Sequence, residues 1–228
     1  YADGCLYVAG GKGKPQTVPI GKDGSQTAPT NPLFSLQLTP SLQKEWVRLP
    51  DFPGPARVQP VLTAQQSEDG IRLYLAGGFQ PASAHQEAIV CTDMLSYHPK
   101  TKQWRNEGFL PSLAGGSHRT VTGGCAIASG DSSILLVGGV NYDRFRDALN
   151  HPEPDYLLHP ADWYKFNTSL LQYNTFTKHW THLGNYEELA RAGAGIANNA
   201  NTVIIIGGEL KPGIRTPEVN AFKLTRHP

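Results

Sequence analysis

Long apolar runs and a surplus of one charge are both missing from this chain of 228 residues. No apolar run approaches the roughly 20 residues that a membrane helix needs, so we expect no membrane partner. The net charge is only +1 and no basic block is present. Because phosphate binding requires clustered lysine and arginine, we expect no nucleic-acid partner either.

Cysteine is also scarce, with Cys5, Cys91 and Cys125 as an odd set of three and no C-x-x-C spacing. Cys5 and Cys125 stand in apolar strands, where a thiol behaves as a small hydrophobic group, and they are poor catalytic candidates. His179 and His182 form an H-x-x-H pattern, but side chains three apart on a strand point to opposite faces. We therefore expect no metal site and no cofactor. Helix signals are few, whereas 24 glycines and 18 prolines suit many turns.

The most informative feature present is a short apolar strand ending in Gly-Gly, which occurs four times. The four copies are LYVAGG at 6–11, LYLAGG at 73–78, LLVGG at 135–139 and VIIIGG at 203–208. A unit repeated at this spacing indicates an array of similar modules. The strand is apolar at nearly every position, which is typical of a strand buried on both faces. Glycine at its end allows a close backbone approach and a positive φ.

A second strand and then a tryptophan follow the first three copies. The tryptophans are Trp46, Trp104 and Trp180, and the last two lie seven residues after Tyr97 and Tyr173. This order of elements is typical of the kelch repeat, in which the aromatic pair packs on the flat of a blade. The sequence thus predicts an all-β fold, a kelch-type β-propeller. Four unrelated strands of a sandwich are the alternative interpretation.

The repeats divide the chain into units of about 1–57, 58–119, 120–191 and 192–228 within a single propeller domain, or about 3.5 to 4 blades. The last unit stops without a tryptophan strand. We therefore interpret the chain as part of a larger propeller, with a four-bladed ring as the other possibility. The chain opens at Tyr1 without a methionine and shows no signal segment, so we expect that a targeting segment was either removed or not included.

Two irregular segments are the expected location of function. Residues 141–164 form an insertion too long for a hairpin, with a helical pattern at 145–149 and many aromatic, histidine and acidic residues. Such long loops are usually lids or binding loops, although a subunit contact is the other interpretation. The second segment, GGELKPGIRT at 207–216, places Glu209, Lys211 and Arg215 just after a Gly-Gly pair. A merely solvated loop is the alternative there.

The second segment resembles the N-acetylneuraminate epimerases, the kelch-type sialic acid mutarotases of bacteria. The resemblance extends to FPGPAR at 52–57, GSH at 116–118, GGVN at 138–141 and DWYKFN at 162–167. It implies a six-bladed propeller and an isomerase that interconverts the anomers of sialic acid without a cofactor. It also implies a periplasmic or secreted location and leaves a homodimer possible. A circularly permuted blade order is a further hypothesis, because the Glu209 loop lies near the C-terminal end.

The resemblance implies that Glu209 and Arg215 are the functional pair. A carboxylate can act as a general base on the anomeric hydroxyl, and a guanidinium can bind the substrate's carboxylate through two parallel hydrogen bonds. We expect four further residues to complete a polar pocket: Arg57, His118, Asn141 and Lys211. A structural role for His118 is an equal alternative. Arg57 and Arg191 follow equivalent strands, and the sequence leaves open which of them is structural.

The rival function is a non-catalytic kelch propeller that binds a protein or a carbohydrate on the same loop face. Such platforms usually have short, regular loops with basic residues at repeated positions, unlike the irregular insertions of this chain. An oxidase-type propeller is a third possibility. That chemistry needs metal or radical ligands, and no Cys/Tyr/His constellation in the sequence requires it.

Overall fold

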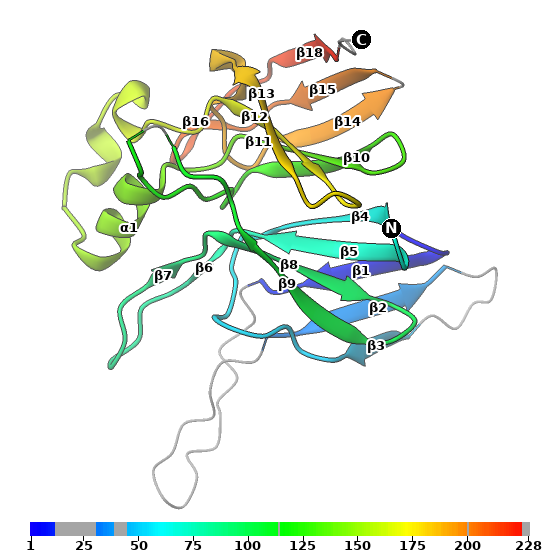
Figure 1. Ribbon diagram of the computed structural model, residues 1–228. Coiled ribbons are helices and arrows are strands. Elements are labelled where there is room, and N and C mark those ends of the chain that lie inside the picture. The colour runs from blue at the N-terminus through cyan, green and yellow to red at the C-terminus, as the bar shows by residue number, and fades with distance from the viewer. Residues whose placement is uncertain (12–30, 39–44, 114, 200, 225–228) are drawn as a thin grey trace, which may run out of the picture.

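Four antiparallel sheets stand side by side around a common centre, like consecutive blades of a propeller (Figure 1). The computed structural model describes residues 1–11, 31–38, 45–113, 115–199 and 201–224. The first sheet contains β1 (Cys5–Ala9), β2 (Leu33–Gln37) and β3 (Trp46–Leu49). The second contains β4 (Val61–Ser67), β5 (Gly70–Ala76), β8 (Asp93–His98) and β9 (Gln103–Phe109).

The third sheet repeats the order of the second, and the fourth repeats its first three strands. The third contains β10 (Cys125–Ser129), β11 (Ser133–Val137), β12 (Ser169–Asn174) and β13 (Trp180–Asn185). The fourth contains β14 (Gly195–Asn199), β15 (Thr202–Ile206) and β18 (Val219–Lys223). Each sheet is a meander of neighbouring antiparallel strands. This is the predicted all-β fold, a kelch-type β-propeller.

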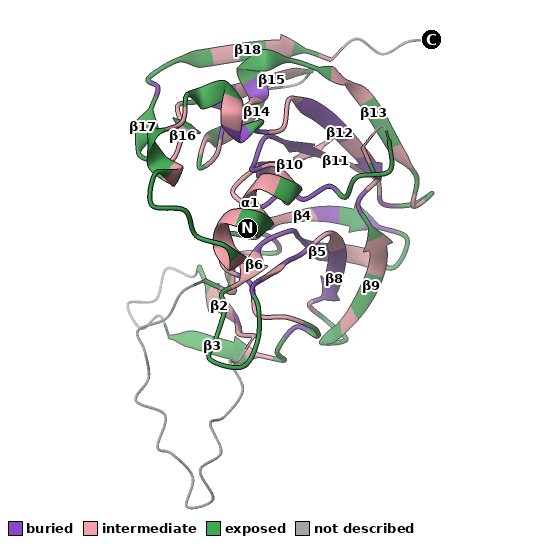
Figure 2. Ribbon diagram, turned by 90° about the vertical axis from the view of Figure 1, so that its left-hand side faces the viewer, coloured by how far each residue is buried: buried purple, intermediate pink, exposed green. Residues whose placement is uncertain are grey.

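The connections that follow the Gly-Gly strands carry the irregular structure and gather on one face (Figure 2). After β5 comes the short hairpin of β6 (Phe79–Gln80) and β7 (Ile89–Val90). After β11 come α1 (Tyr142–Asn150), η1 (Tyr156–Leu158) and η2 (Ala161–Tyr164). After β15 comes the hairpin of β16 (Glu209–Lys211) and β17 (Ile214–Arg215), while η3 (Glu187–Leu189) joins β13 to β14. The predicted helix at 145–149 is confirmed as part of α1.

The hydrophobic core lies between successive sheets. Tyr74 and Met94 of the second sheet pack with Leu136 and Tyr173 of the third, and Val137 packs with Val203 of the fourth. The Gly-Gly strands β5 and β11 are therefore buried on both faces, as predicted. The outermost two copies differ, because the described residues include no further sheet beside them. Side chains of β1 and β15 remain 38 to 49% exposed at Leu6, Val8 and Ile206.

The tyrosine and tryptophan of a unit pack together on the flat of the blade. Tyr97 lies 5.0 Å from Trp104 and Tyr173 lies 4.7 Å from Trp180, measured between ring centres. Both tyrosines are fully buried. Trp46, which lacks the preceding tyrosine, is 51% exposed. The aromatic prediction is thus confirmed for the second and third units and is wrong for the first, where no neighbouring sheet is described on that side.

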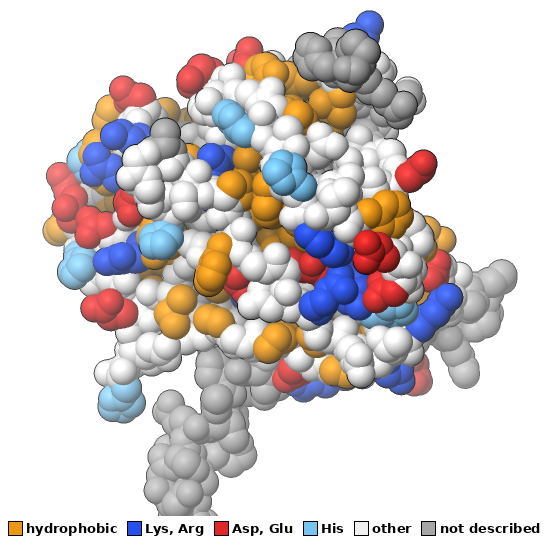
Figure 3. Space-filling model, viewed as in Figure 1, with side chains coloured by type: hydrophobic (Ala, Val, Ile, Leu, Met, Phe, Trp, Pro, Cys, Tyr) orange, Lys and Arg blue, Asp and Glu red, His pale blue; other side chains and the backbone are white. Residues whose placement is uncertain are grey.

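A polar network also joins the second and third blades. The Glu107 carboxylate of β9 accepts hydrogen bonds from Ser96, from Arg105 and, across the interface, from the hydroxyl of Tyr173 at 3.0 Å. Burial raises the pKa of Glu107, but the bonds from Ser96 and Arg105 together with nearby positive charges bring it below the ordinary value. Elsewhere on the visible surface, acidic and basic side chains adjoin one another (Figure 3).

Each Gly-Gly pair is a backbone turn that only glycine fits. The first glycines, Gly10, Gly77, Gly138 and Gly207, have φ of +66°, +61°, +66° and +59°. At Gly138 an added Cβ would lie 2.6 Å from the carbonyl oxygen of Arg191, which belongs to the linker leading to the next blade. The glycine therefore permits both the turn and the contact between blades.

None of the described helices is long and apolar enough to cross a membrane.

Alanine at Gly138 should destabilise the fold more than alanine at Gly130. Both glycines have positive φ, +66° and +58°, so each substitution costs about 1 kcal/mol in backbone strain. Only Gly138 also faces a backbone atom, since an added Cβ at Gly130 meets nothing within 4 Å. We expect Gly138→Ala to lose about 2 kcal/mol more in urea denaturation than Gly130→Ala. Equal losses would show that the turn alone, and not the interblade contact, demands glycine.

Candidate active site

Glu209 and Arg215 face each other across the hairpin of β16 and β17. They are paired in the strand register, and the Nε of Arg215 donates to the Oε1 of Glu209 at 3.4 Å. The side chain of Arg215 is 81% exposed and that of Glu209 is 30% exposed. The two terminal nitrogens of Arg215 form no other hydrogen bond among the described residues. A partly exposed carboxylate thus lies beside a guanidinium with free donors.

The backbone of Glu209 is held firmly although its side chain reaches solvent. Its N–H donates to the carbonyl of Ala192 at 2.7 Å, and the N–H of Ala192 donates back at 3.0 Å. The N–H of Thr216 donates to the carbonyl of Gly208 at 2.9 Å and closes the base of the hairpin. These bonds connect the hairpin to the linker between the third and fourth blades. The carboxylate therefore projects from a fixed point of the scaffold.

Lys211 connects the same hairpin to the long insertion. Its ammonium group donates to the carbonyl of His159 at 2.6 Å and to that of Leu157 at 3.2 Å. Leu157 belongs to η1, and His159 lies between η1 and η2. The sequence predicts Lys211 in the substrate pocket, but these two bonds use the ammonium group to position the insertion. A direct contact between Lys211 and a substrate stays a prediction.

The insertion itself is packed around aromatic rings. Tyr164 is buried and its hydroxyl donates to the carbonyl of Tyr156. The ring of His159 stacks on that of Trp163 at 3.9 Å and 6°, and the guanidinium of Arg144 lies 4.5 Å from the centre of the Trp163 ring. These contacts give the insertion a core of its own, so it is a structured wall beside the hairpin.

His118 and Asn141 lie together at the start of α1. The exposed imidazole of His118 is 5.1 Å from the ring of Tyr142, and the side-chain oxygen of Asn141 accepts a hydrogen bond from the N–H of Arg144 at 3.0 Å. Asn141 thereby caps the helix. The helix α1 is on the same face as the hairpin of β16 and β17 (Figure 2). A contact of either one with substrate stays a prediction.

The guanidinium of Arg57 lies in the contact between blades. Its guanidinium is fully buried, forms an ion pair with Asp93 at 2.7 Å and donates to the carbonyl of Gly77 at 3.0 Å. Arg191 makes equivalent bonds to Glu218 at 2.8 Å and to the carbonyl of Gly207 at 3.2 Å. The sequence left open which arginine is structural. Both are, so we correct the prediction that Arg57 lines the pocket.

In the third blade, Asn167 donates the hydrogen bond to the first glycine of the Gly-Gly pair, a role that sequence reasoning missed. Its amide nitrogen donates to the carbonyls of Thr120 at 2.8 Å, Gly138 at 3.2 Å and Val140 at 3.0 Å. In sequence, the Asn-Thr-Ser pattern at 167–169 indicates a glycosylation acceptor only for a protein made in a eukaryotic secretory pathway. With the amide fully engaged inside the fold, it is unsuited to carry a glycan. Its position after an insertion gave no signal of this role.

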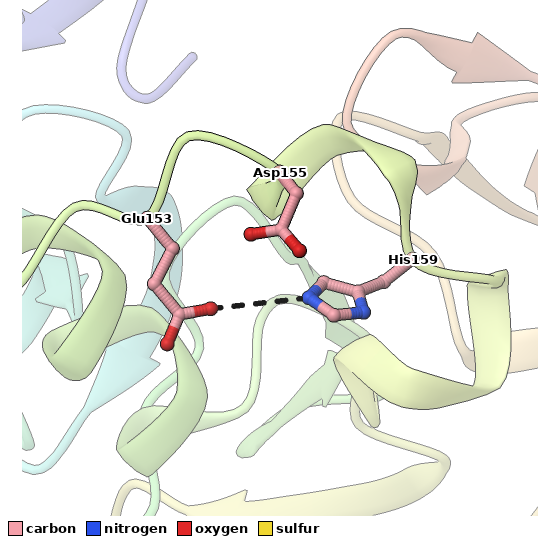
Figure 4. Close-up of side chains that lie close together, drawn as sticks. All are labelled: Glu153, Asp155 and His159. Atoms are coloured by element: carbon pink, nitrogen blue, oxygen red, sulfur yellow. Dashed lines mark ion pairs between the residues drawn. The ribbon is translucent and has the colours of Figure 1, made fainter.

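Glu153, Asp155 and His159 are the one cluster of potential metal ligands found among the described residues (Figure 4). Their ligand atoms lie within 4.8 Å of one another, and both carboxylates are exposed. The ring of His159 is held by its stack on Trp163. Exposed acidic groups commonly gather without an ion, so we interpret the cluster as part of the insertion's own packing. The absence of a metal requirement stays a prediction.

The cysteines are free and mostly inaccessible. Cys91 and Cys125 are buried, and burial raises the pKa of each thiol to about 11. A thiol in that state is neutral at physiological pH and is a poor nucleophile. Neither of these two thiols is therefore a candidate nucleophile.

The model of the family described as N-acetylneuraminate epimerase matches residues 16–227. The chain belongs to the N-acetylneuraminate epimerase family. Two bacterial relatives carry that name. The chain is 27% identical over 215 residues to the N-acetylneuraminate epimerase of Pasteurella multocida, which covers 88% of this chain and 52% of the relative. It is 30% identical over 192 residues to the N-acetylneuraminate epimerase of Haemophilus influenzae (strain PittEE). That alignment covers 79% of this chain and 48% of the relative.

The chain therefore spans about half the length of the curated epimerases it matches. Among solved structures, the protein YjhT is similar with a TM-score of 0.66 and 26% sequence identity. The alignment covers 85% of this chain and 59% of YjhT. In this epimerase-family chain the Glu209 hairpin and the insertion that walls it both lie within the described residues.

Replacing Lys211 should loosen the insertion of this epimerase-family chain. Lys211→Met removes both bonds to the carbonyls of Leu157 and His159, and a hydrogen bond to a charged group contributes about 1.5 to 3 kcal/mol. We expect amide hydrogens of residues 156–160 to exchange about tenfold faster, measured by hydrogen-exchange mass spectrometry. Lys100→Met, at an exposed turn between β8 and β9, is the matched control. Unchanged exchange in the Lys211 variant would contradict a positioning role.

Proposed function

We propose that the protein containing this chain accelerates the interconversion of the α and β anomers of N-acetylneuraminate. The observation that carries the proposal is the exposed Glu209–Arg215 pair, in which a carboxylate and a guanidinium with two free terminal nitrogens lie 3.4 Å apart. Membership of the epimerase family and the names of the relatives support the same substrate. A sugar acid needs both groups: one to move a proton and one to bind its carboxylate.

In the proposed reaction, the Glu209 carboxylate takes the proton of the anomeric hydroxyl as a general base. The bond between the anomeric carbon and the ring oxygen breaks, its electron pair goes to the ring oxygen, and that oxygen takes a proton from water. The product is an open-chain ketone. No electrons are gained or lost, so the step needs no redox partner.

Closure on the other face completes the exchange. Rotation about the bond next to the ketone turns its opposite face toward the attacking hydroxyl. That hydroxyl forms the new bond to the anomeric carbon and releases its proton to water, while protonated Glu209 returns a proton to the former ketone oxygen. Glu209 is regenerated as a carboxylate. The fixed backbone of Glu209 supports this role, because the same group must meet the same oxygen in both directions.

Arg215 is assigned to the substrate's carboxylate. A guanidinium can bind a carboxylate with two parallel hydrogen bonds, whereas a lysine offers a single point charge. The 81% exposure of the side chain leaves it accessible to a ligand. The pair thus orients the anomeric carbon toward Glu209.

The function is tested by following anomer interconversion by proton NMR with the full-length protein. We expect Glu209→Gln to lower kcat by about a hundredfold or more, the usual contribution of general base catalysis. Arg215→Lys should mainly raise KM, by about tenfold, because it loses the two-point contact. Glu68→Gln, at the exposed turn between β4 and β5 at the opposite end of the blade, is the control.

Two outcomes would overturn parts of the proposal. No acceleration by the unmodified full-length protein over the uncatalysed rate would exclude the mutarotase function. An active protein whose Glu209→Gln variant keeps its kcat would leave the function standing and exclude Glu209 as the base. The two results are therefore distinguishable within one series of measurements.

A further inference from the structure

Arg119 is a buried arginine without a partner. It lies in the linker that joins β9 to β10 and is 7% exposed. Its Nε and one terminal nitrogen are buried without a hydrogen-bond partner, and no carboxylate of the described residues forms an ion pair with it. Burial lowers the pKa of Arg119. A guanidinium that remains charged away from water normally has an anion beside it, because an unpaired buried charge is strongly unfavourable.

The architecture of the propeller does not account for Arg119. The other two linkers also contain a buried arginine, but Arg57 and Arg191 leave only Nε unpaired and bond to a carboxylate and to the first glycine of a Gly-Gly pair. In the third blade the corresponding glycine carbonyl, that of Gly138, is taken by Asn167. Arg119 therefore has no acceptor left to bind in the contact between blades.

Arg119 instead lines a cleft of about 380 Å³ on the flank between the second and third blades. Ser112 comes from the linker after β9, and the opposite wall comes from β12 and β13. That wall includes Ser169, Trp180, His182 and Asn185. Among the residues that the structure describes, none that lines the cleft is acidic. The guanidinium thus lies in a pocket whose other polar groups are hydroxyl, amide and imidazole side chains.

Hydrogen bonds among its own side chains hold the polar wall of the cleft in place without a ligand. The hydroxyl of Ser169 donates to the side-chain oxygen of Asn185 at 2.9 Å, and the Nε2 of His182 lies 3.1 Å from the same oxygen. Trp180 is fixed by its packing on Tyr173. A fixed polar wall, an aromatic side chain and a volume within the range of about 300 to 1,000 Å³ are features of small-molecule sites.

We propose that this cleft is a second ligand site, which binds a small sugar acid through a carboxylate held by Arg119. The planar guanidinium matches a carboxylate in a two-point contact. Trp180 offers apolar surface to a sugar ring, and the serine, histidine and asparagine side chains suit its hydroxyl groups. The site is separate from the Glu209 hairpin, which belongs to the fourth blade, and it does not depend on the mutarotase function.

The direct test observes the Nε–Hε signal of Arg119 by nitrogen-15 NMR in the full-length protein. The probes are sodium glucuronate, N-acetylneuraminate, inorganic phosphate and neutral glucose, each titrated into the Glu209→Gln variant so that turnover at the hairpin does not interfere. We expect a saturable shift with at least one sugar acid and none with glucose. No shift with either sugar acid overturns the site. A shift with phosphate equal to that with the sugar acids overturns the sugar-acid specificity and indicates an adventitious ion only.

Arg119→Met provides the second test, with Arg57→Met as its matched control. Removing an unpaired buried charge should leave the melting temperature of the ligand-free protein unchanged or higher, whereas Arg57→Met should lower it by breaking a buried ion pair. Arg119→Met should also weaken sugar-acid binding by about tenfold or more while anomer interconversion continues. A loss of stability equal to that of Arg57→Met would show that Arg119 is structural and contradict the proposal.

Discussion

The contact between each of the first three Gly-Gly turns and the linker to the following blade is the constraint on which the rest of this structure depends. The N–H of Gly11 donates to the carbonyl of Arg57 at 2.8 Å, and that of Gly139 donates to the carbonyl of Arg191 at the same distance. A side chain at Gly10 would come within 2.3 Å of the Arg57 oxygen. The glycines therefore set how closely successive sheets approach, and this spacing in turn determines the core between them.

The same linkers also contact the blade that follows them. The backbone carbonyls of Arg57 and Arg191 each accept a hydrogen bond from the Gly-Gly pair of the blade before the linker. Their guanidinium groups each donate to the Gly-Gly pair of the blade after the linker. Each of these arginines is therefore hydrogen-bonded to the Gly-Gly turns of two successive blades. In the third blade an asparagine on the other side of the turn replaces the arginine side chain. The repeat preserves the contact but not the residue that makes it, and this change is what leaves Arg119 without a structural partner.

The strands could be predicted from sequence because their signals are local: apolar runs ending in Gly-Gly define the buried strands. Glu209 and Arg215 were expected to act together only through the family resemblance, and their pairing across the hairpin came from the structure. Arg57 and Lys211 could not be placed, because their partners are distant in sequence: Asp93 lies 36 residues from Arg57, and His159 lies 52 residues from Lys211. No periodicity encodes such pairs. Trp46 differs from its counterparts for a related reason, since burial depends on a neighbouring sheet that its own repeat does not specify.

The ion pairs of the chain separate into two physical kinds. Arg57 and Asp93 lie 2.7 Å apart around a guanidinium with no exposed surface, so the pair is desolvated and its loss would leave a buried charge. Arg215 and Glu209 lie 3.4 Å apart and Arg215 is largely exposed, so water screens the pair and it adds little to stability. A weak exposed pair on a rigid backbone can exchange its partners for a ligand without a large cost to the fold. This difference supports the proposal that the hairpin, and not the better-formed ion pairs of the blades, exchanges its partners for the charged substrate.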